Sequence, residues 1–163
     1  MTTAEARPES PVTGNEHARR NQRQLALHGT VVLLIGLLAG IGFSYAAATE
    51  SVTSDLYKNW RFAHLEGLVN GIVALAAAGV WAHIDSGRRS VDVGRWLLIV
   101  GAYANAIGPW ITALFIGHRV IDPVGLLESV VVYGFYIPGV LPLASFVLFV
   151  GSQLADRISE RAS

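Results

Sequence analysis

Three polar side chains, His64, Glu66 and Asn70, stand within two helical turns of one another in the segment RFAHLEGLVNG, residues 61–71. The residues that follow, IVALAAAGVWAHI, have the composition of a membrane-spanning helix. An imidazole, a carboxylate and an amide are costly at membrane depth, and they tend to be retained there where they have a function. These three residues are therefore the first candidates for a functional site.

The imidazole of His64 is a candidate metal ligand. On a helix, His64, Gly67 and Gly71 share one face, so two glycines leave a groove beside the ring. Such a groove suits a flat macrocycle whose iron is bound by the histidine, which makes Gly67 and Gly71 candidate cofactor-binding residues. The alternative is an interfacial histidine that hydrogen-bonds outward, and the sequence leaves both open.

Glu66 and Asn70 lie one turn apart on a different face of the same helix, so they can bond one partner or each other. A catalytic role is one interpretation. The other is a polar clamp between helices, which membrane bundles also use. Arg61 and Arg119, expected on the same side of the membrane, are the available cationic partners for Glu66.

The segment GAYANAIGPW, residues 101–110, adds Tyr103 and Asn105 as candidate catalytic residues. They fall on nearly opposite faces of a helix, so we expect one to face the bundle interior and the other a neighbour. Tyr133 and Tyr136, further along, are typical of interfacial aromatic anchors. His118 is the histidine expected at the same depth as His64, and it is the candidate for a second axial ligand.

Four apolar segments position these residues, at 25–48, 61–84, 95–117 and 127–154, and each reaches the roughly 20 residues that span a bilayer. The chain is 52% hydrophobic and 15% charged, against about 25% charged in soluble domains. The sequence thus predicts an all-α, four-helix membrane domain over residues 25–156. Residues 1–24 are expected to be a disordered polar tail, and residues 157–163 a short polar tail.

The basic residues predict the orientation in the membrane. Eight of those that flank the spans fall on one side and three on the other, and cytoplasmic flanks carry the excess. The eight are Arg19, Arg20, Arg23, Arg88, Arg89, Arg95, Arg157 and Arg161, and the three are Lys58, Arg61 and Arg119. We therefore expect a multi-pass protein of the cytoplasmic (inner) membrane with both termini in the cytoplasm.

Other features narrow the function and the packing. Acidic and basic residues balance at twelve each, which gives no indication of a nucleic-acid partner, and the absence of cysteine excludes thiolate sites. Small residues at helical spacing predict close helix contacts, and internal prolines predict kinks. The small residues are Gly36–Gly40, Gly67–Gly71 and Gly101–Ala104–Gly108, and the prolines are Pro109, Pro138 and Pro142.

Three stretches resemble the hydroxylaminobenzene mutases, which are small four-helix membrane enzymes: LHGTVVLLIGLLAG, AHLEGLVNG and GAYANAIGPW. The resemblance covers roughly residues 25–154. A more distant one is to styrene oxide isomerase, a four-helix membrane protein in which a histidine at the start of the second helix binds haem b. That histidine and the Asn-Gly pair after it match His64 and Asn70–Gly71.

These resemblances imply a redox-neutral rearrangement of a small lipophilic aromatic substrate, with His64 binding the iron of haem b at a subunit contact of a trimer. Asn70 and Asn105 would then position the substrate oxygen, and Glu66 would orient His64 across the subunit contact or bind a haem-side arginine. The catalytic tyrosine and aspartate of styrene oxide isomerase correspond to Pro109 and Gly101 here. The expected reaction is therefore hydroxylaminobenzene to 2-aminophenol.

Three alternatives stay open at this stage. The first is isomerisation of styrene oxide to phenylacetaldehyde. The second is a haem protein for electron transfer or sensing, which calls for a second axial ligand. The third is a scaffold without enzymatic activity, in which Glu66 and Asn70 serve packing alone.

Overall fold

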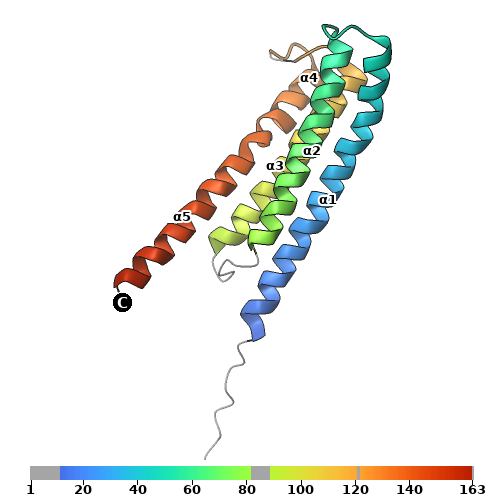
Figure 1. The fold of residues 1–163 in the computed structure, drawn as a ribbon. Helices are drawn as coiled ribbons and strands as arrows, with labels where there is room; N and C mark the ends of the chain where they lie inside the picture. Colours follow the sequence, from blue (N-terminus) through green and yellow to red (C-terminus); the bar gives the residue numbers. More distant parts are fainter. Residues whose placement is uncertain (1–11, 82–88, 121, 163) are drawn as a thin grey trace, which may run out of the picture.

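The computed structural model describes residues 12–81, 89–120 and 122–162, and this part of the chain is helical with no strand. Short turns join the helices (Figure 1). The elements are α1 (Val12–Thr49), α2 (Asp55–Trp81), α3 (Arg89–Ile111), η1 (Thr112–Ile116), α4 (Leu126–Val131), η2 (Val132–Tyr136), η3 (Pro138–Val140) and α5 (Leu141–Ala162).

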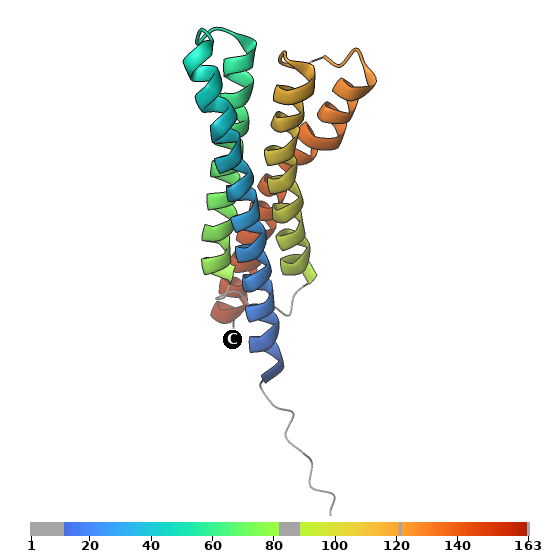
Figure 2. The ribbon, with the colours of Figure 1, turned by 90° about the vertical axis from the view of Figure 1, so that its right-hand side faces the viewer.

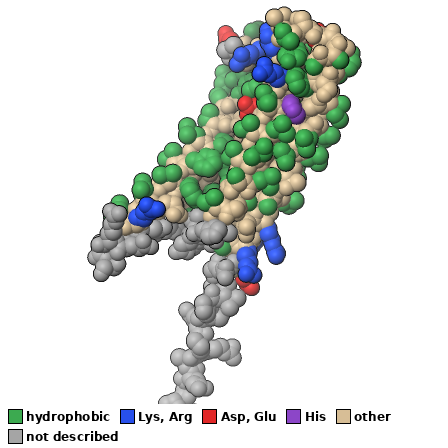
Figure 3. Space-filling model, in the orientation of Figure 1, with side chains coloured by type: hydrophobic (Ala, Val, Ile, Leu, Met, Phe, Trp, Pro, Cys, Tyr) green, Lys and Arg blue, Asp and Glu red, His purple; other side chains and the backbone are tan. Residues whose placement is uncertain are grey.

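Four helical stretches are long and apolar enough to cross a membrane, which confirms the predicted fold class. Their ends lie at two levels, and α1 begins at the same end of the molecule at which α5 finishes (Figures 1 and 2). Hydrophobic side chains cover the flank between the two ends, and basic side chains gather at both ends (Figure 3). The four stretches are Ala18–Thr49, Asp55–Trp81, Arg89–Ile116 and Leu126–Ala155.

Both terminal helices extend further than expected. α1 begins at Val12, so residues 12–24 are helical and the prediction of a disordered tail is wrong for them; residues 1–11 lie outside the described part. α5 likewise continues to Ala162, through most of the expected polar tail. Both extensions are rich in Arg, Glu, Gln and Ala, which favour helix, and lengthening a formed helix costs little once the apolar span has nucleated it.

Local signals set several helix ends. The Ser54 hydroxyl accepts the backbone N–H of Tyr57 at 3.2 Å and caps α2. Gly117, at φ 78°, ends η1 in the left-handed conformation that glycine adopts most readily. The Glu128 carboxylate accepts the backbone N–H groups of Val124 and Gly125 at 2.7 and 3.2 Å and starts α4. These contacts hold the turns against the ends of the spans.

The closest helix contact joins α1 and α2 through glycine backbones. A Cβ on Gly36 would lie 2.5 Å from the carbonyl carbon of Gly67, and a Cβ on Gly71 would lie 2.6 Å from the backbone nitrogen of Leu33. Real side chains do not fit at such distances, so these glycines are what lets the two helices meet. The prediction of close contacts at small residues is confirmed here.

α3 contacts α1, α2 and the fourth span, whereas α5 packs on α3 and lies apart from α1 (Figure 1). The fourth span is interrupted at Pro138, where η2 and η3 separate α4 from α5, as the prolines predict. The ring of Pro142 fills the space left by Gly101, and the Phe135 side chain lies against Gly108. The fourth span, which the prolines interrupt, therefore packs against the face of α3 that carries the small residues.

Candidate functional site

The His64 imidazole lies in the contact between α2 and α1. Its Nδ1 is 2.8 Å from the backbone carbonyl oxygen of Gly36. The ring stacks on Phe43, with centroids 5.8 Å apart and planes inclined by 17°. A Cβ on Gly40 would lie 3.0 Å from ring atoms of His64, so this glycine makes room for the imidazole. The ring is half-buried and held on three sides by α1.

The Gly36 contact fixes the tautomer of His64, because a carbonyl oxygen only accepts a hydrogen bond. Nδ1 therefore carries the proton and donates it, and in the neutral ring Nε2 keeps its lone pair. A ring held by its Nδ1–H toward a backbone carbonyl is the usual arrangement of a metal-ligating histidine. His64 thus fits the role of a single axial ligand to haem iron.

The two glycines expected to flank a haem have a different function. Gly67 and Gly71 are both buried, and the backbones of Gly36 and Leu33 occupy the space beside them. The groove that the sequence suggests beside His64 is filled by α1. Within one protomer a macrocycle bound to His64 would therefore lie outside this helix contact, and binding of it by Gly67 and Gly71 stays a prediction.

Glu66, Asn70 and Asn105 form one hydrogen-bonded chain across α2, α3 and η3. The Asn70 amide donates to the backbone carbonyl and the carboxylate of Glu66, both at 2.9 Å. The Asn105 amide donates to the Asn70 carbonyl oxygen at 3.1 Å and to the Gly139 backbone carbonyl at 2.9 Å. Gly139 is needed there, because a Cβ at this position would overlap the Asn105 side chain.

The chain leaves neither amide with an unused N–H group, since each –NH₂ makes two hydrogen bonds. Its open end is Glu66, which is half-buried. The ion pair expected with Arg61 or Arg119 is not among the contacts of the described residues. Glu66 also does not orient His64 within the protomer, because the Gly36 carbonyl does so. Asn70 and Asn105 are therefore arranged to position Glu66.

Tyr103 lies apart from this chain. Its hydroxyl is 3.1 Å from His28 Nδ1 on α1, and the two rings meet edge to face. Tyr103 and Asn105 contact different helices, since Tyr103 meets α1 and Asn105 meets α2 and η3, and this separates Tyr103 from the other candidate catalytic residues. His118 is bonded elsewhere too, since its Nε2 is 3.0 Å from a Glu128 carboxylate oxygen. No described contact joins His118 to His64.

Metal binding by side chains alone has no support in the described ranges, where no group of three or more His, Asp and Glu residues could hold an ion. His64 is a lone candidate ligand. A metal at this position would accordingly arrive in a prosthetic group that supplies the other donors.

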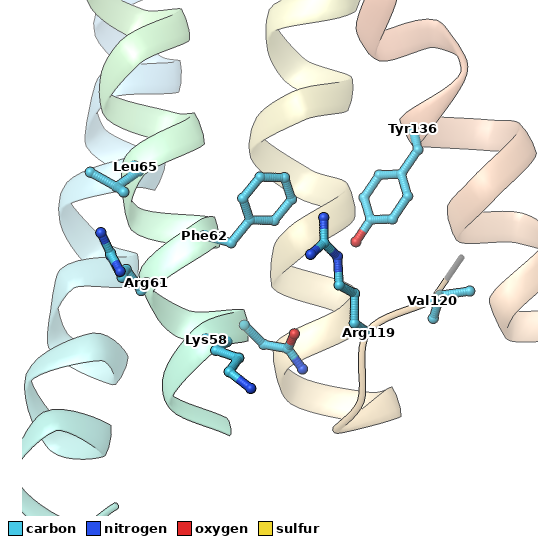
Figure 4. A pocket seen from close by; sticks show the side chains of 8 residues that line it. Lys58, Arg61, Phe62, Leu65, Arg119, Val120 and Tyr136 are labelled. Atoms are coloured by element: carbon cyan, nitrogen blue, oxygen red, sulfur yellow. The ribbon is translucent and has the colours of Figure 1, made fainter. Parts of the chain in front are cut away.

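Sequence reasoning missed a cavity of about 460 Å³ near the start of α2 (Figure 4). Tyr136, expected to be an interfacial anchor, lines it and hydrogen-bonds the Thr112 hydroxyl at 2.8 Å. A cluster of basic residues near one membrane interface was the available signal, but their convergence depends on the turn after η1. The lining residues are Lys58, Asn59, Arg61, Phe62, Leu65, Arg119, Val120 and Tyr136.

Four membrane-crossing helices, with a histidine and a carboxylate–amide chain built into their contacts, define a small multi-pass membrane protein with polar sites at membrane depth. Residues 21–154 match the sequence model of the styrene oxide isomerase family, and the chain belongs to this family. It is thus a member of an isomerase and mutase family, as the sequence resemblance implied.

A curated relative is hydroxylaminobenzene mutase HabA of Ectopseudomonas oleovorans, which is 28% identical over 110 residues. The alignment covers 66% of this chain and 73% of HabA. No solved structure matches the chain.

Proposed function

We propose that this protein is a membrane isomerase that converts hydroxylaminobenzene, or a similar small lipophilic aryl hydroxylamine, into the 2-aminophenol. The observation that carries the proposal is the Nδ1–H bond from His64 to the Gly36 carbonyl, which leaves Nε2 free to bind the iron of haem b. Membership of the family and the similarity to HabA support the reaction class.

The reaction balances without an oxidant or reductant. The N–O bond of the substrate breaks, a C–O bond forms at the ortho carbon, and the hydrogen on that carbon leaves as a proton. One proton is returned to the nitrogen, so substrate and product have the same composition. The protein has to draw charge onto the leaving oxygen and give the ring proton a base.

Haem iron bound at His64 supplies a Lewis acid for the oxygen. Glu66 is the base that takes the ring proton, and Asn70 with Asn105 holds its carboxylate in place. The apolar surroundings keep water from the electron-poor ring during the rearrangement.

His64 and Glu66 lie on different sides of α2, one toward α1 and the other toward α3. A site that uses both therefore takes them from neighbouring copies of the chain. This agrees with the trimer that the resemblance implies, with haem at the subunit contact. A homo-oligomer is thus part of the proposal.

Two positions favour the mutase reaction over styrene oxide isomerisation. Pro109 and Gly101 stand at the positions that correspond to the catalytic tyrosine and aspartate of styrene oxide isomerase. Pro109 is fully buried, and the Pro142 ring fills the space beside Gly101. Neither position offers a hydroxyl or carboxylate. Electron transfer is disfavoured because His118 is bonded to Glu128 rather than placed opposite His64.

We also propose that the protein resides in the cytoplasmic membrane with both termini in the cytoplasm. Support comes from the eight basic residues of the predicted cytoplasmic side and from the start of α1 and the end of α5, which lie at the same end of the molecule (Figure 1). Reporter fusions at Met1 and after Ser163 test this. A periplasmic signal from either one would contradict it.

The test of function is a visible absorption spectrum of the protein purified in mild detergent, followed by product analysis. We expect a Soret band of a five-coordinate haem and conversion of hydroxylaminobenzene to 2-aminophenol without added reductant. A bis-histidine spectrum would favour electron transfer. Faster turnover of styrene oxide would assign the other family reaction, and a protein without haem or activity would refute the proposal.

A further inference from the structure

The cavity at the start of α2 has a polar end and an apolar end. Lys58 and Arg61 from α2 and Arg119 from the turn after η1 supply three cations, and no acidic residue lines it. Phe62 and Tyr136 place two aromatic rings across it, with centroids 6.5 Å apart (Figure 4). Its volume of about 460 Å³ lies within the range of small-molecule sites.

The cations are largely free to meet a ligand. Lys58 has a loose contact of 3.8 Å with Asp55. Arg61 and Arg119 make no ion pair with a carboxylate among the described residues. Arg119 acts electrostatically on the Tyr136 hydroxyl, and so does Glu66, whose carboxylate is already bonded to Asn70. A guanidinium group near a low-dielectric wall favours an oxyanion, which it binds with good geometry.

A second, independent observation comes from Asn59. This side chain lines the cavity and is 6% exposed, yet its amide Nδ2 has no hydrogen-bond partner. A buried donor without a partner costs roughly 1–3 kcal/mol. A ligand that brings an acceptor oxygen to this amide would satisfy the donor.

The apolar side chains of the cavity are also exposed on the outside of α2. Phe62 and Leu65 line the cavity and are each 44% exposed; Phe62 directly follows Arg61, and Leu65 lies about one turn further along α2. A ligand body can lie along these side chains while its head meets Arg119. The required ligand has one anionic oxygen group on an apolar ring or chain.

We propose that this cavity is a binding site for an amphiphilic oxyanion, with Arg119 and the Asn59 amide holding the anionic head, Arg61 adding positive charge, and Phe62 and Leu65 holding the apolar body. The head is a carboxylate or a phosphate, from an aromatic acid or from an anionic phospholipid. The site uses neither His64 nor haem, so it stands or falls separately from the isomerase reaction.

The experiment measures thermal unfolding of the full-length protein in phosphatidylcholine nanodiscs. One arm adds 2-naphthoate, with 2-naphthamide as the uncharged analogue. The other arm replaces part of the phosphatidylcholine by phosphatidylglycerol. A ligand present at ten times its Kd lowers the equilibrium constant of unfolding about 11-fold. We expect naphthoate or phosphatidylglycerol to raise Tm by the corresponding amount, and naphthamide to leave Tm unchanged.

Variants locate the effect. Arg119→Gln and Asn59→Leu should each weaken binding by about tenfold or more, the scale for losing a charged or buried hydrogen bond. Arg157→Gln is the matched control, since this exposed arginine belongs to the last turns of α5, which ends at the opposite end of the molecule from the start of α2 (Figure 1). A response to naphthoate alone identifies an acid as the ligand, and a response to phosphatidylglycerol alone identifies a lipid. No response to either, or equal responses in Arg119→Gln and the parent, would overturn the proposal.

Discussion

The two sides of α2 accommodate the polar groups of this membrane-spanning helix in different ways. Toward α1, contact rests on shape: glycine backbones meet, and the His64 ring between the helices uses a single nitrogen and keeps the other. Toward α3, contact rests on hydrogen bonds, and the amides of Asn70 and Asn105 spend all their donors on protein acceptors. The glycine contact thus leaves the second ring nitrogen of His64 unused, whereas the amide chain uses every N–H group of Asn70 and Asn105.

This difference assigns separate tasks. In the proposed function the α1 side would provide a ligand atom, His64 Nε2, and the α3 side would position one carboxylate, that of Glu66. The clamp and catalytic interpretations of the polar residues are therefore compatible, because the amides can clamp while the carboxylate acts as the base. Four substitutions test the distinction.

The largest effect is expected from His64→Ala. The variant should insert into the membrane and lose its haem, because neither Leu65 nor Gly67 can replace the axial bond. The measurement is the Soret absorbance per mole of protein, with His118→Ala as a control that keeps its haem. Added imidazole should restore part of the band. Full haem retention in His64→Ala would make the ring an interfacial histidine.

Glu66→Gln should come next. Gln keeps an oxygen that accepts from Asn70 but is not a base, so turnover should fall by about 100-fold, near the lower end for losing a general base, while haem and Tm stay close to the parent values. Tyr103→Phe is the control, because its hydroxyl bonds His28 away from the chain. Turnover of Glu66→Gln within a few-fold of the parent would mean that the hydrogen-bonded residues Glu66, Asn70 and Asn105 serve packing alone.

Gly67→Ala tests the glycine side. A Cβ at this position overlaps the backbone of Gly36, and such overpacking typically costs about 1–3 kcal/mol. Because Gly36 carries the carbonyl that holds His64, haem affinity should fall together with the free energy of unfolding. Gly79→Ala on the same helix is the matched control, since a Cβ there meets nothing within 4 Å. Equal Tm values for the two variants would contradict the close contact between Gly67 and Gly36.

The smallest effect is expected from Asn70→Leu, which keeps the volume and removes the amide. The loss of its hydrogen bonds should cost from a fraction of a kcal/mol to about 2 kcal/mol, as is usual within membranes. Turnover per bound haem should fall less than in Glu66→Gln, because the carboxylate is present but less well held. A melting curve and product formation normalised to haem measure both. A larger loss of turnover than in Glu66→Gln would place the Asn70 amide on the substrate.

Much of the fold is determined by the sequence alone. Apolar length and helical period are local properties, so four spans, the proline-broken fourth span and the shared face of His64, Gly67 and Gly71 follow directly from the residues. The spacing of Glu66 and Asn70 likewise predicts that they meet, and they do. The family resemblance was also contained in these local segments.

The tertiary structure decided what each face meets. Periodicity does not fix the rotation of one helix against another, which depends on the packing of all the spans together. For this reason Gly67 and Gly71 proved to be packed on α1, Tyr103 to be paired with His28, and Asn70 to be joined to Asn105. The free Nε2 of His64 also depends on a carbonyl 28 residues away in the chain. Composition placed the polar groups at membrane depth, and helix packing determined which of their atoms stay available for chemistry.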